Sequence, residues 1–120
     1  ARWGPPPNIQ ALLDAGADVR ARTEADQTPL HHAAAYGTPE NIRALLDAGA
    51  DVMVWMVDGE TPLHYAARWG TPENIQALLA AGADGKAKNK NGETPWDLAQ
   101  ENEKLKGTAA YWALNDAQLN

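Results

Sequence analysis

The 120-residue sequence contains no cysteine and no serine. Without thiols the chain can form neither a disulfide framework nor a thiolate zinc site, and this composition favours a cytoplasmic location for a natural protein. The absence of serine removes a common hydroxyl nucleophile, and no glycine-rich phosphate loop or dinucleotide fingerprint follows a strand pattern. These absences predict a protein that is not an enzyme and that uses no cofactor.

Long apolar runs and an excess of positive charge are also missing. No run approaches about 18 apolar residues, and the N-terminus lacks the charged-then-apolar pattern of a signal peptide. The 10 basic and 16 acidic residues give a net charge of −6, which opposes binding to phosphate backbones and anionic membranes. We therefore expect a soluble protein that binds neither nucleic acid nor membranes.

An internal repeat of 33 residues organises the chain. The tetrapeptide Thr-Pro-Leu-His occupies residues 28–31 and 61–64, and a weaker copy, Thr-Pro-Trp-Asp, occupies residues 94–97. Aligning residues 23–55 with residues 56–88 gives 19 identities in 33 positions. A repeat of this length predicts a solenoid of stacked units that forms one domain over residues 1–120. Its predicted parts are a partial N-terminal repeat (1–22), two full repeats (23–55 and 56–88) and a C-terminal capping repeat (89–120).

Each full repeat carries the start and stop patterns of two helices. Threonine is a good N-cap and proline is favoured at the first helical position, so Thr-Pro-Leu predicts a first helix, which Gly37 and Gly70 end. A second Thr-Pro-Glu, at residues 38–40 and 71–73, predicts a second helix. Gly49 and Gly82 are placed to end that helix in the left-handed conformation. Each unit is therefore predicted to be helix, turn, helix and a hairpin-like loop.

The pattern Thr-Pro-Leu-His-x-Ala-Ala-x-x-Gly followed by Leu-Leu-x-Ala-Gly-Ala-Asp resembles the ankyrin repeat. The resemblance covers nearly the whole chain and implies an all-α ankyrin-repeat solenoid. It implies L-shaped units whose loops project as fingers and whose first helices line a concave face through which partners are contacted. It implies no reaction, because one fold serves many functions.

The two ends depart from the repeat. Residues 1–4 copy residues 67–70, so the chain opens in the middle of a repeat, which we interpret as an engineered boundary or an end covered by a partner. In the last repeat, Tyr111 and Trp112 stand in the positions of the leucine pair at 78–79. We expect these two rings and Trp96 to form the core of a C-terminal cap.

The histidines and repeated aspartates are expected to be structural. His31 and His64 follow the capping threonine by three residues, where each ring can hydrogen-bond to the threonine hydroxyl. Asp18, Asp51 and Asp84 recur after Gly-Ala, which indicates turn formation. We therefore expect no metal site.

Large aromatic residues recur at one repeat position. Trp3, Tyr36 and Trp69 precede the glycine that ends the first helix, and in register they would form a stripe of roughly 20 Å. Tyr and Trp are frequent binding hot spots, so we interpret the stripe as a contact surface. The alternative is that these rings only pack on neighbouring helices.

The loop at residues 53–57 is apolar, whereas the corresponding loops at 20–24 and 86–90 are polar. If the loop alternates as a hairpin, Met53, Trp55 and Val57 share one face, while Val54 and Met56 take the other. Exposed apolar patches usually mark interfaces. This contrast between loops predicts a surface selected for one partner.

The sequence thus predicts a non-enzymatic protein-binding scaffold, which we expect to be engineered. The alternative is a homo-oligomer that assembles through the same apolar surface; the partner's identity stays open. Asp58, Glu60 and Arg68 are expected at the rim of the interface. The full predicted surface comprises Trp3, His32, Tyr36, Met53, Trp55, Met56, Val57, Asp58, Glu60, Tyr65, Arg68 and Trp69.

Overall fold

The computed structural model describes residues 27–119, which form six α-helices and contain no strand. The helices are α2 (Pro29–Tyr36), α3 (Pro39–Asp47), α4 (Pro62–Trp69), α5 (Pro72–Ala80), α6 (Pro95–Ala99) and α7 (Ala109–Leu119). The first helices of successive repeats begin 33 residues apart, as the sequence period predicts.

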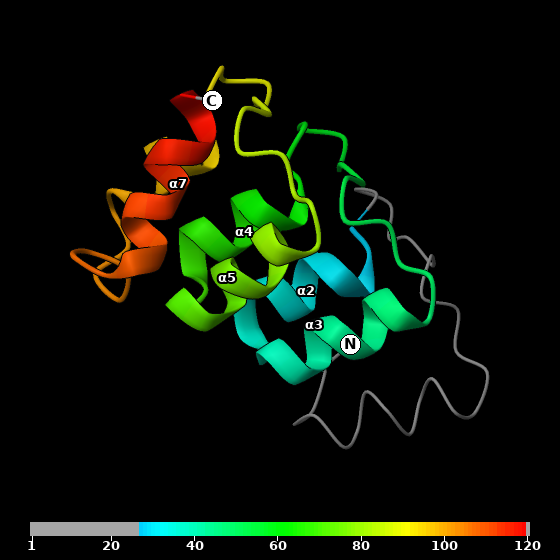
Figure 1. Cartoon of the computed structure of the whole chain (residues 1–120). Helices are drawn as coiled ribbons and strands as arrows, with labels where there is room; N and C mark the ends of the chain where they lie inside the picture. Colours follow the sequence, from blue (N-terminus) through cyan, green and yellow to red (C-terminus); the bar gives the residue numbers. More distant parts are fainter. Residues whose placement is uncertain (1–26, 120) are drawn as a thin grey trace.

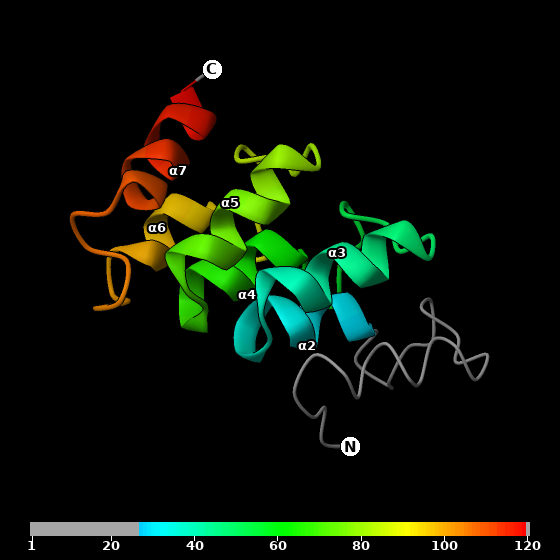
Figure 2. The same cartoon turned by 60° about the horizontal axis from the view of Figure 1, so that its bottom comes forward.

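The helices are arranged in two layers (Figures 1 and 2). Helix α4 packs between α2 and α6 in one layer, and α5 packs between α3 and α7 in the other. Each helix of the first layer also packs against the helix that follows it in the chain. The described part of the chain is therefore a stack of helix pairs, and its core lies between the layers. This confirms the predicted all-α solenoid.

The Thr-Pro pattern starts the helices as predicted. In α2 to α6 a threonine N-cap in extended conformation accepts a hydrogen bond from the backbone N–H three residues later, and proline follows it. The capping residues are Thr28, Thr38, Thr61, Thr71 and Thr94. Gly37 and Gly70 end α2 and α4. Gly49 and Gly82 follow α3 and α5 with φ of 105° and 96°, the predicted left-handed conformation.

Two buried asparagines join successive repeats. The Nδ2 atom of Asn74 donates to the carbonyl oxygens of Ala34 and Gly37, each at 3.1 Å. The Nδ2 atom of Asn102 makes the same pair of bonds one repeat later, to the carbonyls of residues 67 and 70, at 3.2 and 3.1 Å. Buried carbonyls without a hydrogen bond are costly. Each amide therefore stabilises the end of the preceding repeat's first helix by donating to carbonyls that have no partner within that helix. At the same repeat position, the amide nitrogen of Asn41 is buried without an acceptor among residues 27–119.

The C-terminal cap differs from the prediction in its register. Helix α6 has only five residues, and turns follow it before α7 begins after Thr108. Because of this irregular connection, Ala110 and Leu114 are the buried residues of α7. The expectation that Trp112 belongs to the cap core is wrong, since its side chain is 54% exposed.

The other two predicted cap aromatics do pack against the core. Trp96 and Tyr111 are partly buried, and their ring centroids lie 4.5 Å apart. Leu105, which lies in the connection between α6 and α7, is fully buried in the same core. The cap therefore closes with two aromatic rings and aliphatic side chains.

Candidate functional site

The exposed rings of Tyr36 and Trp69 are stacked on the surface of α2 and α4. Their centroids lie 6.3 Å apart with an angle of 22° between the planes, and the side chains are 64% and 41% exposed. This arrangement matches the predicted register of the aromatic stripe. Trp3, the third predicted member, lies outside the described residues. The stack is a preformed apolar surface, because each ring already supports the other.

Two further rings extend the stack. The Tyr65 and Trp69 rings form a T-shaped pair with centroids 5.2 Å apart, and the centroids of the His32 and Tyr36 rings also lie 5.2 Å apart. Both side chains are half-buried. Burial, followed by the nearby charges of Asp58 and Glu60, raises the pKa of Tyr65. We call the surface formed by His32, Tyr36, Tyr65 and Trp69 the aromatic face.

Arg68 forms an ion pair beside the aromatic face. Its Nη2 atom donates to Oε2 of Glu60, and its guanidinium lies 5.3 Å from the centre of the Trp69 ring. The hydrogen bond to Glu60 raises the pKa of Arg68, against the opposing effect of burial. Asn89 Nδ2, from the next repeat, also donates to Glu60 at 2.9 Å.

The expected place of Glu60 at an exposed rim is wrong. Its side chain is only 5% exposed, because Arg68 and Asn89 cover its carboxylate. Asp58 is exposed as predicted, and its carbonyl accepts the Lys90 backbone N–H of the following loop at 2.9 Å. Of the three charged residues expected at a rim, Asp58 and Arg68 reach the surface, and Glu60 anchors Arg68.

The loop between α3 and α4 is a hairpin-like turn. The backbone N–H of Met56 donates to the Glu60 carbonyl at 2.9 Å, and the N–H of Gly59 donates to the Met56 carbonyl at 2.8 Å. Earlier in the loop, the Asp51 carboxylate accepts the N–H of Met53, which confirms the predicted turn-forming role of this aspartate. Asp84 makes the same bond one repeat later, whereas Asp18 lies outside the described residues.

Side chains of this loop alternate between the surface and the interior. Met53, Trp55 and Val57 are exposed, with Trp55 reaching 65%, and we call these three side chains the loop tip. Val54 and Met56 are buried. The predicted alternation is therefore confirmed, but the expectation that Met56 faces a partner is wrong, because it is only 6% exposed.

The loop tip borders an apolar hollow of about 340 Å³. It is shared with the N-cap of α4 and with the following loop; its lining consists of Met53, Trp55, Gly59, Thr61, Ala87 and Lys88. Because Thr61 begins α4, this hollow connects the loop tip to the helix that carries Trp69.

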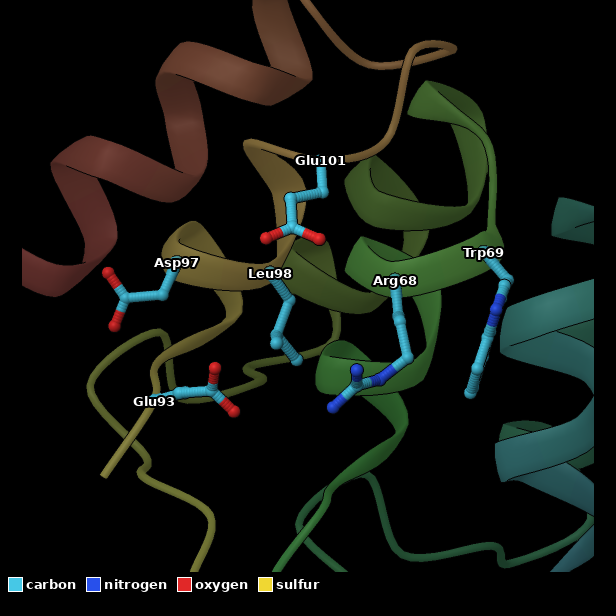
Figure 3. A pocket seen from close by; sticks show the side chains of 6 residues that line it. All are labelled: Arg68, Trp69, Glu93, Asp97, Leu98 and Glu101. Carbon is cyan, nitrogen blue, oxygen red and sulfur yellow. The ribbon is translucent and has the colours of Figure 1, made fainter. Parts of the chain in front are cut away.

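A second pocket, of about 400 Å³, lies between α4 and α6 (Figure 3). It combines an aromatic wall with three carboxylates; its lining consists of Arg68, Trp69, Glu93, Asp97, Leu98 and Glu101. Sequence reasoning missed the acidic side of this pocket. The available signal was a pair of changes at the repeat period, since Asp97 replaces His64 and Glu101 replaces Arg68.

The repeat histidines hold the structure together as predicted. The Nδ1 atoms of His31 and His64 lie 2.9 Å from the hydroxyls of Thr28 and Thr61, and both rings are fully buried. Within residues 27–119, no three His, Cys, Asp or Glu side chains are grouped so that they could hold a metal ion. No helix in the same range has the length and apolarity that crossing a membrane requires.

The comparison with known families agrees with this architecture. A family model described as ankyrin repeats (3 copies) matches residues 1–89. No curated protein matches the chain. With helix pairs at a 33-residue period, Thr-Pro caps and buried histidines that bond to the next loop, the chain belongs to the ankyrin-repeat family.

Proposed function

We propose that this chain is a non-enzymatic scaffold that binds another protein through the aromatic face and the loop tip. Ankyrin repeats are generally protein–protein interaction modules. The observation that carries the proposal is the stack of Tyr36 on Trp69, which presents two large rings to solvent on adjacent repeats. Exposed Tyr and Trp side chains are the residues most often found at the energetic centre of interfaces.

The rigidity of the aromatic face supports this role. Trp69 is held between the Tyr36 ring, the Tyr65 ring and the Arg68 guanidinium. A ring that is already fixed loses little conformational entropy when a partner covers it, so more of the contact energy appears as affinity. The aromatic face is therefore suited to supply anchor residues.

The loop tip supports the same proposal from a neighbouring position. Met53, Trp55 and Val57 alternate with the buried Val54 and Met56 and stay 37%, 65% and 51% exposed. At the following loop, the corresponding positions are Lys86, Lys88 and Lys90. The contrast indicates that the apolar side chains are not needed for the hairpin itself. We also retain the hypothesis that such a surface was engineered.

Self-association through the same surface is the second candidate. It is favoured by the apolar hollow beside Trp55, because a hollow next to an exposed ring is the combination that a two-fold interface can use in both directions. Light scattering coupled to gel filtration separates the two candidates. A monomer near 12.9 kDa supports a foreign partner, whereas a dimer that Trp55→Ala dissociates supports self-association.

Selection from a random peptide library displayed on phage tests the binding proposal directly. We expect selected peptides to lose about thirtyfold in affinity with Tyr36→Ala, Trp69→Ala or Trp55→Ala, since each removes an anchor worth about 2 kcal/mol. Trp112→Ala is the matched control, because it removes an exposed tryptophan from α7. Peptides whose affinity is insensitive to all three variants would show that the aromatic face and loop tip are not the binding surface.

A further inference from the structure

The Glu60–Arg68 pair shows how this fold holds a guanidinium beside a first helix. Glu60 lies just before α4, and Arg68, on the last turn of α4, donates to its carboxylate. Glu93 occupies the position of Glu60 one repeat later, just before α6. The residue that corresponds to Arg68 is Glu101, so the acid is repeated and its cation is not.

The missing cation coincides with an open space. The pocket between α4 and α6 is lined by Glu93 and Glu101 at the positions where the preceding repeat has its ion pair. Leu98 lines it at the position of Tyr65, whose ring in the preceding repeat packs against Trp69. Both replacements put a smaller side chain at the edge of this pocket, whose volume is about 400 Å³.

The charges around this pocket favour a cationic occupant. Figure 3 shows Glu93 and Glu101 beside Leu98 on the side of α6, with Arg68 and Trp69 on α4 opposite, and the Asp97 carboxylate directed away from α4. Arg68 is the cation of the lining, and its guanidinium is paired with Glu60. Glu93 and Glu101 therefore face the pocket against one cation that already has its own counter-ion. The Asp97 carboxylate at the edge of the lining accepts the Thr94 backbone N–H at 3.0 Å as the capping residue of α6, and the Glu93 carboxylate also accepts Asn89 Nδ2 at 3.1 Å.

The apolar part of the lining suits the hydrocarbon stem of a long cationic side chain. Leu98 and Trp69 present hydrocarbon surface beside the carboxylates. An arginine side chain combines an aliphatic stem with a planar guanidinium, so the stem can cover Leu98 while the head reaches the acids. The guanidinium is also the group that the equivalent carboxylate, Glu60, holds within this chain.

We propose that this pocket binds an arginine side chain presented by the partner protein. The inference rests on the proposed function, because it names the chemistry of the partner at the edge of the aromatic face. The partner's guanidinium binds Glu93 and Glu101. In the capping repeat it thus takes the place that Arg68 has in the preceding repeat, where it pairs with Glu60. The partner of this acidic chain is therefore a protein with an exposed arginine near its apolar contact surface.

A titration with N-acetyl-L-arginine amide tests the pocket without a partner protein. In ¹H–¹⁵N NMR spectra of the full chain, the indole resonance of Trp69 is assigned with Trp69→Phe. We expect that resonance to shift in a saturable way, with a Kd on the order of a few millimolar for one side chain. N-acetyl-L-citrulline amide, which has nearly the same shape but no charge, should bind about tenfold more weakly or not at all.

Variants of the acids locate the effect. The double variant Glu93→Gln with Glu101→Gln should lose the shift, and Glu101→Gln alone should weaken it, which keeps the test valid if the double variant fails to fold. Glu73→Gln is the matched control, because Glu73 is an exposed acid of α5 that does not line the pocket. Glu101→Arg should supply the cation within the chain and abolish binding of the arginine amide.

The outcome separates this proposal from the proposed function. No saturable shift, equal binding of the citrulline amide, or a shift that survives in the double variant would overturn the arginine pocket. If selected peptides still depend on Trp69 and Tyr36 in that case, protein binding through the aromatic face stands and the arginine pocket alone fails.

Discussion

His64 Nε2 lies 2.9 Å from the backbone carbonyl oxygen of Glu93, so one imidazole bonds α4 to the loop that enters the following repeat. Its Nδ1 accepts the Thr61 backbone N–H at 3.2 Å. Because that N–H can only donate, the proton of the neutral ring is assigned to Nε2, which donates to the carbonyl. His31 repeats this arrangement one repeat earlier, with the carbonyl of Glu60.

Replacing His64 by alanine should lower the free energy of unfolding by about 1–3 kcal/mol, since it leaves the buried Thr61 N–H and the partly buried Glu93 carbonyl without their partner. Urea unfolding followed by circular dichroism measures the loss. His32→Ala is the matched control: the half-buried His32 should cost less, about 1 kcal/mol or below. Equal losses for the two variants would contradict the bridging role of His64.

The same ring predicts how stability depends on pH. Burial is the main reason that the pKa of His64 lies below its ordinary value of 6.5. As pH falls below about 6.5, the unfolded chain therefore binds a proton that the folded chain does not, and the free energy of unfolding decreases. Unfolding measured between pH 7.5 and pH 5 should show this decrease. His64→Ala should reduce the slope without abolishing it, because burial also lowers the pKa of His32; an unchanged slope would contradict the assignment.

Leu78→Ala should cost about 2–5 kcal/mol, because Leu78 is fully buried in the core between stacked repeats. Leu79 is the matched control within α5, since it is only partly buried and its truncation should cost clearly less. Both values come from chemical denaturation at constant m-value. A larger loss at Leu79 than at Leu78 would mean that the packing register of α5 is wrong.

Truncating two neighbouring residues of the loop should have very different effects on stability. Met56→Ala should lower the free energy of unfolding by about 2 kcal/mol or more, because Met56 is buried. Trp55→Ala should change it by about 0.5 kcal/mol or less, because Trp55 is exposed. Thermal unfolding of both variants checks the difference. Unfolding of the Trp55 variant would show that this ring supports the fold.

Alanine substitutions at two glycines with positive φ distinguish the cost of backbone strain from the cost of a steric contact. Gly82 has φ of 96° with open space around it, so Gly82→Ala should cost only the left-handed strain, about 1 kcal/mol. Gly59 has φ of 82°, and a Cβ there would lie 3.1 Å from the Asn89 Cα atom. Gly59→Ala should therefore cost more than Gly82→Ala in urea unfolding. Similar losses would show that the following loop moves aside freely.

The helix pairs were predictable because their determinants are local. Threonine caps, proline at the first helical position and glycine stops act within a few residues, so α2 to α5 could be placed from the sequence. The rings of Tyr36 and Trp69 were predictable for a related reason, since a period of 33 residues places equivalent positions side by side.

The predictions from the sequence that proved wrong depend on contacts or spacing between repeats. Glu60 is buried because Arg68 and Asn89 both cover its carboxylate, and Asn89 belongs to the next repeat. Trp112 was misplaced because α7 begins 37 residues after α5, from position 72 to position 109, which is four residues more than the period, so that Leu114 is buried instead. A fixed period therefore fails in the cap.

The buried asparagines that join successive repeats lie apart from the side chains that form the exposed surface. Asn74 and Asn102 each bond one repeat to the end of the first helix of the preceding repeat, and both side chains are buried. Hydrogen bonds from an interior amide to backbone carbonyls therefore join the repeats that carry Tyr36 and Trp69 without involving the two rings. Other side chains at positions 36 and 69 would keep the same spacing, because these hydrogen bonds do not depend on them. The fold can therefore present a different contact surface while the packing between its repeats stays unchanged.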